Sequence, residues 1–206
     1  MSPAIPPDLS RPLRDAMAPS LRALHAAGAA EPPLRVPCAA VAIGPGRLAR
    51  AAASPAAGRA TLEALYRRCL LRYREAVADE QPAAGADDLG AVLANFVAAN
   101  LHALHGTRPP AEALRALAQQ LAGIVRGSAV WRTAPLRERQ AYTEQLAILA
   151  VLMVDLAAIA PRQGPDAVAE LQGRARGYLR QLLGLDPDAL TLDVSGLALR
   201  QEPVAA

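Results

Sequence analysis

The stretch LAILAVLMVDLAAIA, residues 146–160, constrains the fold more than any other part of the chain. It is apolar except for Asp155, and its length is short for a membrane span but typical of a helix buried inside a protein. The helix that contains it is predicted to run from about Pro135 to Ala160 and to be apolar on nearly every side. Such a helix needs others around it, so the sequence predicts a bundle with this helix at its centre.

Four further segments repeat apolar residues at helical spacing. They lie around residues 62–77, between Asp87 and Gly106, from the end of RPP to about residue 125, and at about 166–183. Aromatic residues make up only 3% of the chain, so alanine and leucine must supply the core, which favours helices over sheets. We therefore expect a single all-α domain, a bundle of five or six helices at residues 57–199.

The two ends of the chain are predicted to lie outside this bundle. Ten of the eighteen prolines fall in residues 1–55, so residues 1–56 are expected to form a proline-rich arm with one short helix around 9–27. The phrase AIGPGRLAR at 42–50 is interpreted as a turn in this arm. After a turn of helix that starts at Asp186, alternating apolar residues predict a short extended tail, followed by a C-terminal segment at 200–206.

The charge pattern argues against nucleic-acid binding. All 22 basic residues are arginines, which with the abundant alanine suggests a GC-rich bacterial genome. Residues 1–50 hold six arginines and three acids, whereas residues 51–206 hold sixteen of each, so the folded part is neutral. A nucleic-acid binder should instead carry a basic face on the domain itself.

The start of the chain and the cysteines leave the compartment open. MSPAIPPDLSRPLRDAM lacks the basic start and apolar run of a signal peptide, so the chain as written is expected to be cytoplasmic. A protein whose signal had been replaced by Met1 would look the same and would be periplasmic or secreted. Cys69 falls on an apolar stripe and is expected to be a buried free thiol, although a disulfide with Cys38 stays open.

The phrase NLHALHG at 100–106 raises the question of a metal site. On a helical wheel His102 and His105 point away from the apolar stripe of their helix. Two ligands do not make a zinc site, and the one other histidine, His25, lies in the arm. We therefore expect a solvated helix end, with no bound metal and no cofactor.

Asn100 is the more informative residue, because it falls in the middle of the apolar stripe. A buried amide needs hydrogen-bond partners. Gln140 and Glu144, from a polar seam on the central helix that also contains Asp155, are expected to supply them, or an arginine of the preceding helix. This network is interpreted first as structural, with a polar pocket around Asn100, Gln140, Tyr142 and Glu144 as the alternative.

The phrase YRRCLLRYRE carries the densest basic cluster, namely Arg67, Arg68, Arg72 and Arg74. Nearby acids neutralise part of it, so a solvated face with pairs inside the helix is the simplest interpretation. The sharper hypothesis is a contact surface for an acidic protein partner.

Three phrases together resemble an uncharacterised bacterial family of all-helical proteins, whose members often carry secretion signals. They are DDLGAVLANFVAANLHALHG at 87–106, RERQAYTEQLAILAVLMVD at 137–155 and LGLDPDALTLDVSGLAL at 183–199. The shared positions are two acids at a helix start, a late asparagine, a Gln-Tyr-acid set and a Gly-containing tail, here Asp87, Asp88, Asn100, Gln140, Tyr142, Glu144 and residues 183–197. The resemblance covers about residues 57–199 and implies an all-α fold, but no activity, cofactor or substrate.

No catalytic constellation emerges from these residues. Glu144 and Asp155, for example, would lie about 16 Å apart along one helix, too far to act on one bond. Our first hypothesis is therefore a non-enzymatic protein–protein interaction module, of accessory or inhibitor type, with a protein partner or a second copy of itself. The alternative is a small-molecule-binding protein or enzyme that uses the pocket around Asn100 and Glu144.

Overall fold

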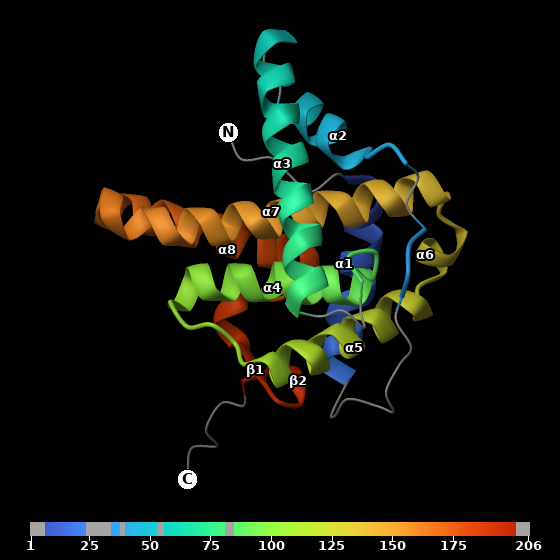
Figure 1. Cartoon of the computed structure of the whole chain (residues 1–206). Coiled ribbons are helices and arrows are strands. Elements are labelled where there is room, and N and C mark those ends of the chain that lie inside the picture. The colour runs from blue at the N-terminus through green and yellow to red at the C-terminus, as the bar shows by residue number, and fades with distance from the viewer. Residues whose placement is uncertain (1–6, 24–33, 38–39, 53–55, 81–84, 201–206) are drawn as a thin grey trace.

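A computed structural model of the chain describes residues 7–23, 34–37, 40–52, 56–80 and 85–200. Its helices are α1 (Pro7–Ala23), α2 (Gly44–Ala51), α3 (Ala56–Glu80), α4 (Leu89–His105), α5 (Ala111–Gly127), α6 (Ala129–Thr133), α7 (Leu136–Gln163) and α8 (Pro165–Leu183). A 3-10 turn, η1 (Pro187–Ala189), leads into strands β1 (Leu190–Asp193) and β2 (Gly196–Leu199). The described part of the chain is thus mostly helical, with a small two-stranded sheet near its C-terminal end (Figure 1).

Helix α7 lies at the centre, as its sequence predicts. It packs against α2, α3, α4 and α8, and its residues Leu146, Ile148 and Leu149 are at most 1% exposed. Helices α4 and α7 run side by side, and α3 crosses both of them (Figure 1). By length and composition alone α7 could also cross a membrane, but more than half of its most apolar window is buried within the protein, as in a core helix.

The described residues form eight helices, of which α3 to α8 lie in the region of the predicted bundle and α1 and α2 in the proline-rich N-terminal region, where one short helix was predicted. Helix α1 contains two prolines, yet it buries Leu13, Met17 and Leu21 against the rest of the protein. It packs against α5 and α8, far along the chain. The helical prediction around 9–27 is confirmed for residues 9–23, and residues 24–33 lie outside the described part.

The interpretation of AIGPGRLAR as a turn is wrong, because Gly44–Ala51 is helix α2. This helix has no side-chain cap from its own N-cap residue, Ile43. Its first N–H groups bind a carboxylate on α7 instead, and Leu48 is completely buried. A contact from a distant part of the chain therefore stabilises a helix that the local sequence does not signal.

Asp88 joins the start of α4 to an extended segment of the N-terminal region. One of its side-chain oxygens, Oδ1, accepts hydrogen bonds from Gly90 N at 3.0 Å and from Leu34 N at 2.9 Å. Backbone bonds from Val36 N to Asp87 O and from Leu89 N to Leu34 O continue the contact. Asp88, the second of the two acids at the predicted helix start, is thus both the helix cap and the anchor of residues 34–36.

The predicted extended tail is one half of a β-hairpin. Strands β1 and β2 pair antiparallel, with Leu190 opposite Leu199. The side chain of Gln120 on α5 docks the hairpin, because it accepts from Leu197 N and donates to Leu197 O, both at 2.8 Å. Leu190 and Leu197 then fill the space against the helices.

Candidate functional site

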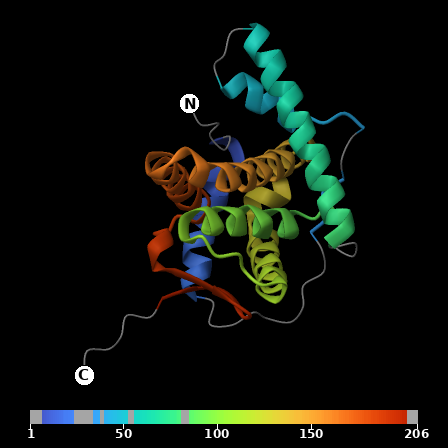
Figure 2. The same ribbon diagram turned by 60° about the vertical axis from the view of Figure 1, so that its left-hand side comes forward.

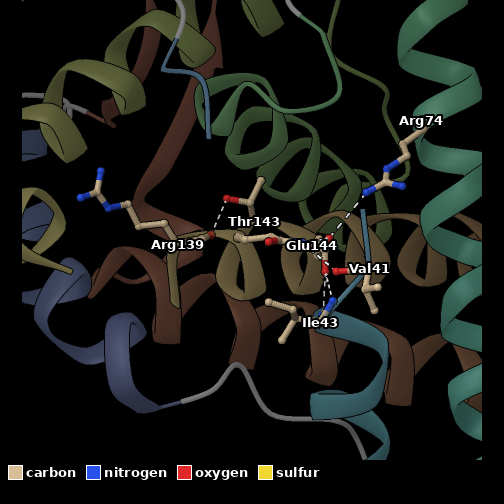
Figure 3. A network of polar contacts seen from close by, with 8 residues as sticks. Val41, Ile43, Arg74, Arg139, Thr143 and Glu144 are labelled. Atoms are coloured by element: carbon tan, nitrogen blue, oxygen red, sulfur yellow. Dashed lines mark hydrogen bonds and ion pairs between the residues drawn. The ribbon is translucent and has the colours of Figure 1, made fainter. Parts of the chain in front are cut away.

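The polar seam predicted on α7 forms a buried joint with α2. The Glu144 side chain is 2% exposed, and its Oε2 accepts hydrogen bonds from Ile43 N and Gly44 N, both at 2.7 Å. Its Oε1 accepts from Gln140 Nε2 at 2.9 Å and lies 3.5 Å from Arg74 Nη2 (Figure 3). A Cβ on Gly44 would lie 2.6 Å from Glu144 Cβ, so only glycine permits this approach.

This joint uses all the acceptor positions that the carboxylate offers. An ionised carboxylate has about four lone-pair sites, and two backbone N–H groups, one amide and one guanidinium face them here. Gln140 also donates to Val41 O at 3.2 Å. The arrangement binds the chain around residues 41–44 to α7 and leaves Glu144 little capacity to hold a ligand or move a proton.

Asn100 and Tyr142 take no part in this joint. Asn100 is fully buried and donates to Phe96 O of its own helix at 2.7 Å, while its Oδ1 has no hydrogen-bond partner among the described residues. The expectation that Gln140, Glu144 or an arginine would satisfy its amide is therefore wrong. The Tyr142 hydroxyl likewise has no hydrogen-bond partner in the described part of the chain, and burial raises the pKa of Tyr142. A pocket that uses these residues stays a prediction.

The four arginines of the basic cluster on α3 have different environments. Arg72 forms two hydrogen bonds to Asp155 on α7, at 2.6 and 3.0 Å, and Arg74 faces Glu144. Arg67 pairs with Glu63 one turn earlier in α3. The guanidinium of Arg68 is exposed and has no ion pair in the described part of the chain. Half of the cluster thus holds α3 on α7, and the polar seam of α7 provides the carboxylates.

The side of α3 that faces away from α7 is exposed along its length. We call it the α3 outer face, and its residues are Ala60, Ala64, Arg67, Arg68, Leu71 and Glu75. Leu71, at its centre, is 55% exposed. The first half of α3 extends past the other helices together with α2 (Figures 1 and 2).

The two histidines of α4 differ from each other, so the prediction of a solvated pair is only half correct. His105 is exposed, but His102 is partly buried, and its Nδ1 is covered by protein without a hydrogen-bond partner among the described residues. No group of three or more His, Cys, Asp or Glu side chains that could hold a metal occurs in that part of the chain.

Cys69 is a free, buried thiol on the inner side of α3, as expected. Burial is the largest cause that raises the pKa of this thiol, with Asp155 adding to it. Cys38 lies outside the described residues. A thiol with a raised pKa is mostly protonated and is a poor nucleophile, so Cys69 serves as a packing residue.

A groove between α3, α4 and α7 was not predicted. It encloses about 490 Å³, and its lining includes Ala98, Ala99, Ala150, Val151 and Val154 from α4 and α7. Asn95 and His102 of α4, Arg72 and Glu75 of α3, and Arg108 of the following loop add polar groups. The one sequence signal is that Asn95, Ala98, Ala99 and His102 recur on a single face of α4.

Comparison with known proteins yields a family but no activity. The model of a family of unknown function (DUF6683) matches residues 14–200, from within α1 to the end of β2. No curated protein matches the chain, and no solved structure does.

Proposed function

The chain belongs to this family of unknown function, and we propose from its own surface that it is a non-enzymatic module that binds another protein through the α3 outer face. The observation that carries the proposal is Leu71, a large apolar side chain 55% exposed on the outer face of a helix whose first half extends past the other helices. Its partner would be a protein with an acidic, helical contact surface.

The shape of the α3 outer face suits a helical partner. Ala60, Ala64 and Leu71 are exposed on the same side of the helix, and small side chains allow a second helix to approach closely. Leu71 would then provide the apolar centre that is common in protein interfaces. On the opposite side of α3, Tyr66, Leu70 and Tyr73 are already buried in the core. A partner can therefore cover the outer face without rearranging the fold.

The charges around Leu71 favour an acidic protein over a nucleic acid. Arg68 has no ion pair in the described part of the chain and can face a carboxylate of a partner. Arg67, Arg72 and Arg74 are each close to a carboxylate of this chain, which reduces the positive charge available to phosphates. Such a surface fits an accessory or inhibitor protein, which acts by occupying its partner.

Site-specific photocrosslinking of the full chain tests this proposal. Residues 1–56 should stay in place, because deleting them would remove Leu13, Met17 and Leu48 from the core. We expect a photoreactive residue at Ala64, exposed on the α3 outer face near Leu71, to crosslink one protein from the source cells. The same residue at Val194, which is 65% exposed on the hairpin, should not crosslink it.

The competing outcomes are distinct. Leu71→Glu and Arg68→Glu should each abolish capture of that protein while leaving the thermal unfolding midpoint unchanged. A crosslink between two copies of this chain, lost in Leu71→Glu, would make the partner a second copy. Capture that is equal from positions 64 and 194, or that survives both substitutions, would exclude the α3 outer face.

A further inference from the structure

The groove between α3, α4 and α7 lies beside the α3 outer face and shares Glu75 with it. Neither Leu71 nor Arg68 lines it. Its volume of about 490 Å³ lies within the range of small-molecule sites, and its floor of alanine and valine side chains is apolar. A floor of this kind favours a ligand with an apolar body.

The polar groups at the end of α4 indicate what the head of such a ligand would be. Nδ1 of His102 is covered by protein and has no acceptor among the described residues, which favours the tautomer with the proton on Nε2, and His102 is part of the groove's lining. Arg108, from the loop after α4, also lines the groove and has no ion pair among the described residues. Two hydrogen-bond donors, one of them positively charged, therefore stand at this end.

The α3 wall carries a different charge balance. Arg72 is held by Asp155, and the carboxylate of Glu75 is exposed there. The uncompensated positive charge of the groove is thus at Arg108, and a negatively charged head is attracted to that end and repelled from the α3 wall. The charge asymmetry orients the ligand as well as selecting it.

We propose that this groove binds a small amphiphilic carboxylate. Its carboxylate accepts hydrogen bonds from Arg108 and from His102 Nε2, and its apolar chain lies on Ala98, Val151 and Val154. A guanidinium can hold a carboxylate through two parallel hydrogen bonds, which makes the head group the source of specificity. The apolar chain supplies affinity by leaving water.

Octanoate is a suitable probe, with octanol and octylamine as matched neutral and cationic molecules. Each would be titrated into the ¹⁵N-labelled full chain while amide NMR shifts are recorded. We expect saturable shifts in α4, α7 and residues 107–108 with octanoate, at a Kd of about 1 mM or tighter, as ligand efficiency allows for a molecule of this size. Octanol and octylamine should bind about tenfold more weakly or not at all, because they lose the charged hydrogen bonds.

Two variants locate the site. Arg108→Gln should weaken octanoate binding about tenfold and bring it to the level of octanol. Ala76→Trp, at an exposed position on the wall of the groove, should block all three probes. Arg115→Gln, at an exposed arginine of α5 outside the groove, is the matched control and should bind octanoate normally.

Several results would overturn the proposal. One is the absence of saturable shifts at octanoate concentrations up to about 10 mM. Others are equal binding of octanoate and octanol, or binding that Ala76→Trp leaves intact. Vesicles of phosphatidylglycerol separate a free carboxylate from an anionic lipid surface, and binding to vesicles without binding of octanoate would also contradict it.

Discussion

Replacing Glu144 by glutamine tests whether one buried carboxylate holds the N-terminal region on the core. The side chain keeps its size, but one acceptor oxygen becomes an NH₂ group. Since Ile43 N and Gly44 N donate to one oxygen, and Gln140 and Arg74 face the other, at least one donor must then meet another donor. The perturbation therefore acts on hydrogen bonding and charge while the packing volume stays the same.

The expected loss follows from these contacts. Hydrogen bonds to a charged group contribute about 1.5–3 kcal/mol each, while removing a buried charge relieves part of its desolvation cost, so we expect the free energy of unfolding to fall by ~2–4 kcal/mol. The Arg74 side chain is 40% exposed, so its ion pair adds little to this figure. Most of the loss comes from the two backbone N–H groups at the start of α2.

Urea unfolding and hydrogen exchange measure the two parts of this prediction. The midpoint should fall at an unchanged m-value, and amides of residues 47–52 should exchange faster than those of α4. Glu63→Gln, in an exposed pair on α3, is the control and should change stability by no more than about 0.5 kcal/mol. If Glu144→Gln matched this control, or if α2 stayed protected, Glu144 would not be the anchor of α2.

Three further predictions concern local contacts. Gly44→Ala should destabilise the protein by about 1–3 kcal/mol, because its Cβ would lie 2.6 Å from that of Glu144. Gly173→Ala, with open space around the new Cβ, should instead stabilise the protein by about 0.4–1 kcal/mol. Changes of the same sign in the free energy of unfolding, measured in urea, would contradict this. Burial raises the pKa of Asp88, so its contribution to stability is greatest below about pH 4 and is lost as the pH rises through the folded-state pKa. Asp88→Asn keeps the capping oxygen, so its free energy of unfolding should rise relative to that of the unsubstituted protein as the pH goes from about 4 to 7. A fall in this difference, measured by urea unfolding, would contradict the prediction. Gln120→Ala removes two hydrogen bonds to the hairpin and should cost about 1–3 kcal/mol, with faster exchange at Leu197 N; unchanged exchange there would show that packing alone holds the hairpin.

Helix positions could be predicted wherever the signal is local. The C-caps Gly106 and Gly184 both adopt the left-handed conformation that glycine favours, and α4, α5, α7 and α8 begin and end close to the predicted residues. The buried state of residues 146–150 of α7 follows from the apolar composition of this helix, whereas Val154 and Ile159 further along it are 39% and 45% exposed. In each case the residues that decide the outcome lie within a few turns of one another.

The two proposed binding surfaces depend on pairs of residues that are far apart in the chain. Arg72 and Asp155 are separated by 83 positions, and Gly44 and Glu144 by 100. The sequence shows a basic cluster on one helix and a polar seam on another, but not that the two meet. Because contacts within the chain occupy three of the four arginines, the proposed partner surface is limited to the region of Arg68 and Leu71. The groove at His102 arises in the same way, because α3 crosses α4.

Periodicity and capping thus decide which segments form helices, because helical hydrogen bonds and side-chain stripes connect residues three or four positions apart. The packing of those helices decides which polar groups are occupied and which remain free, because that depends on contacts across the whole chain. Helix α2 shows the difference most directly, since the N–H groups at its start are bound by Glu144 on α7.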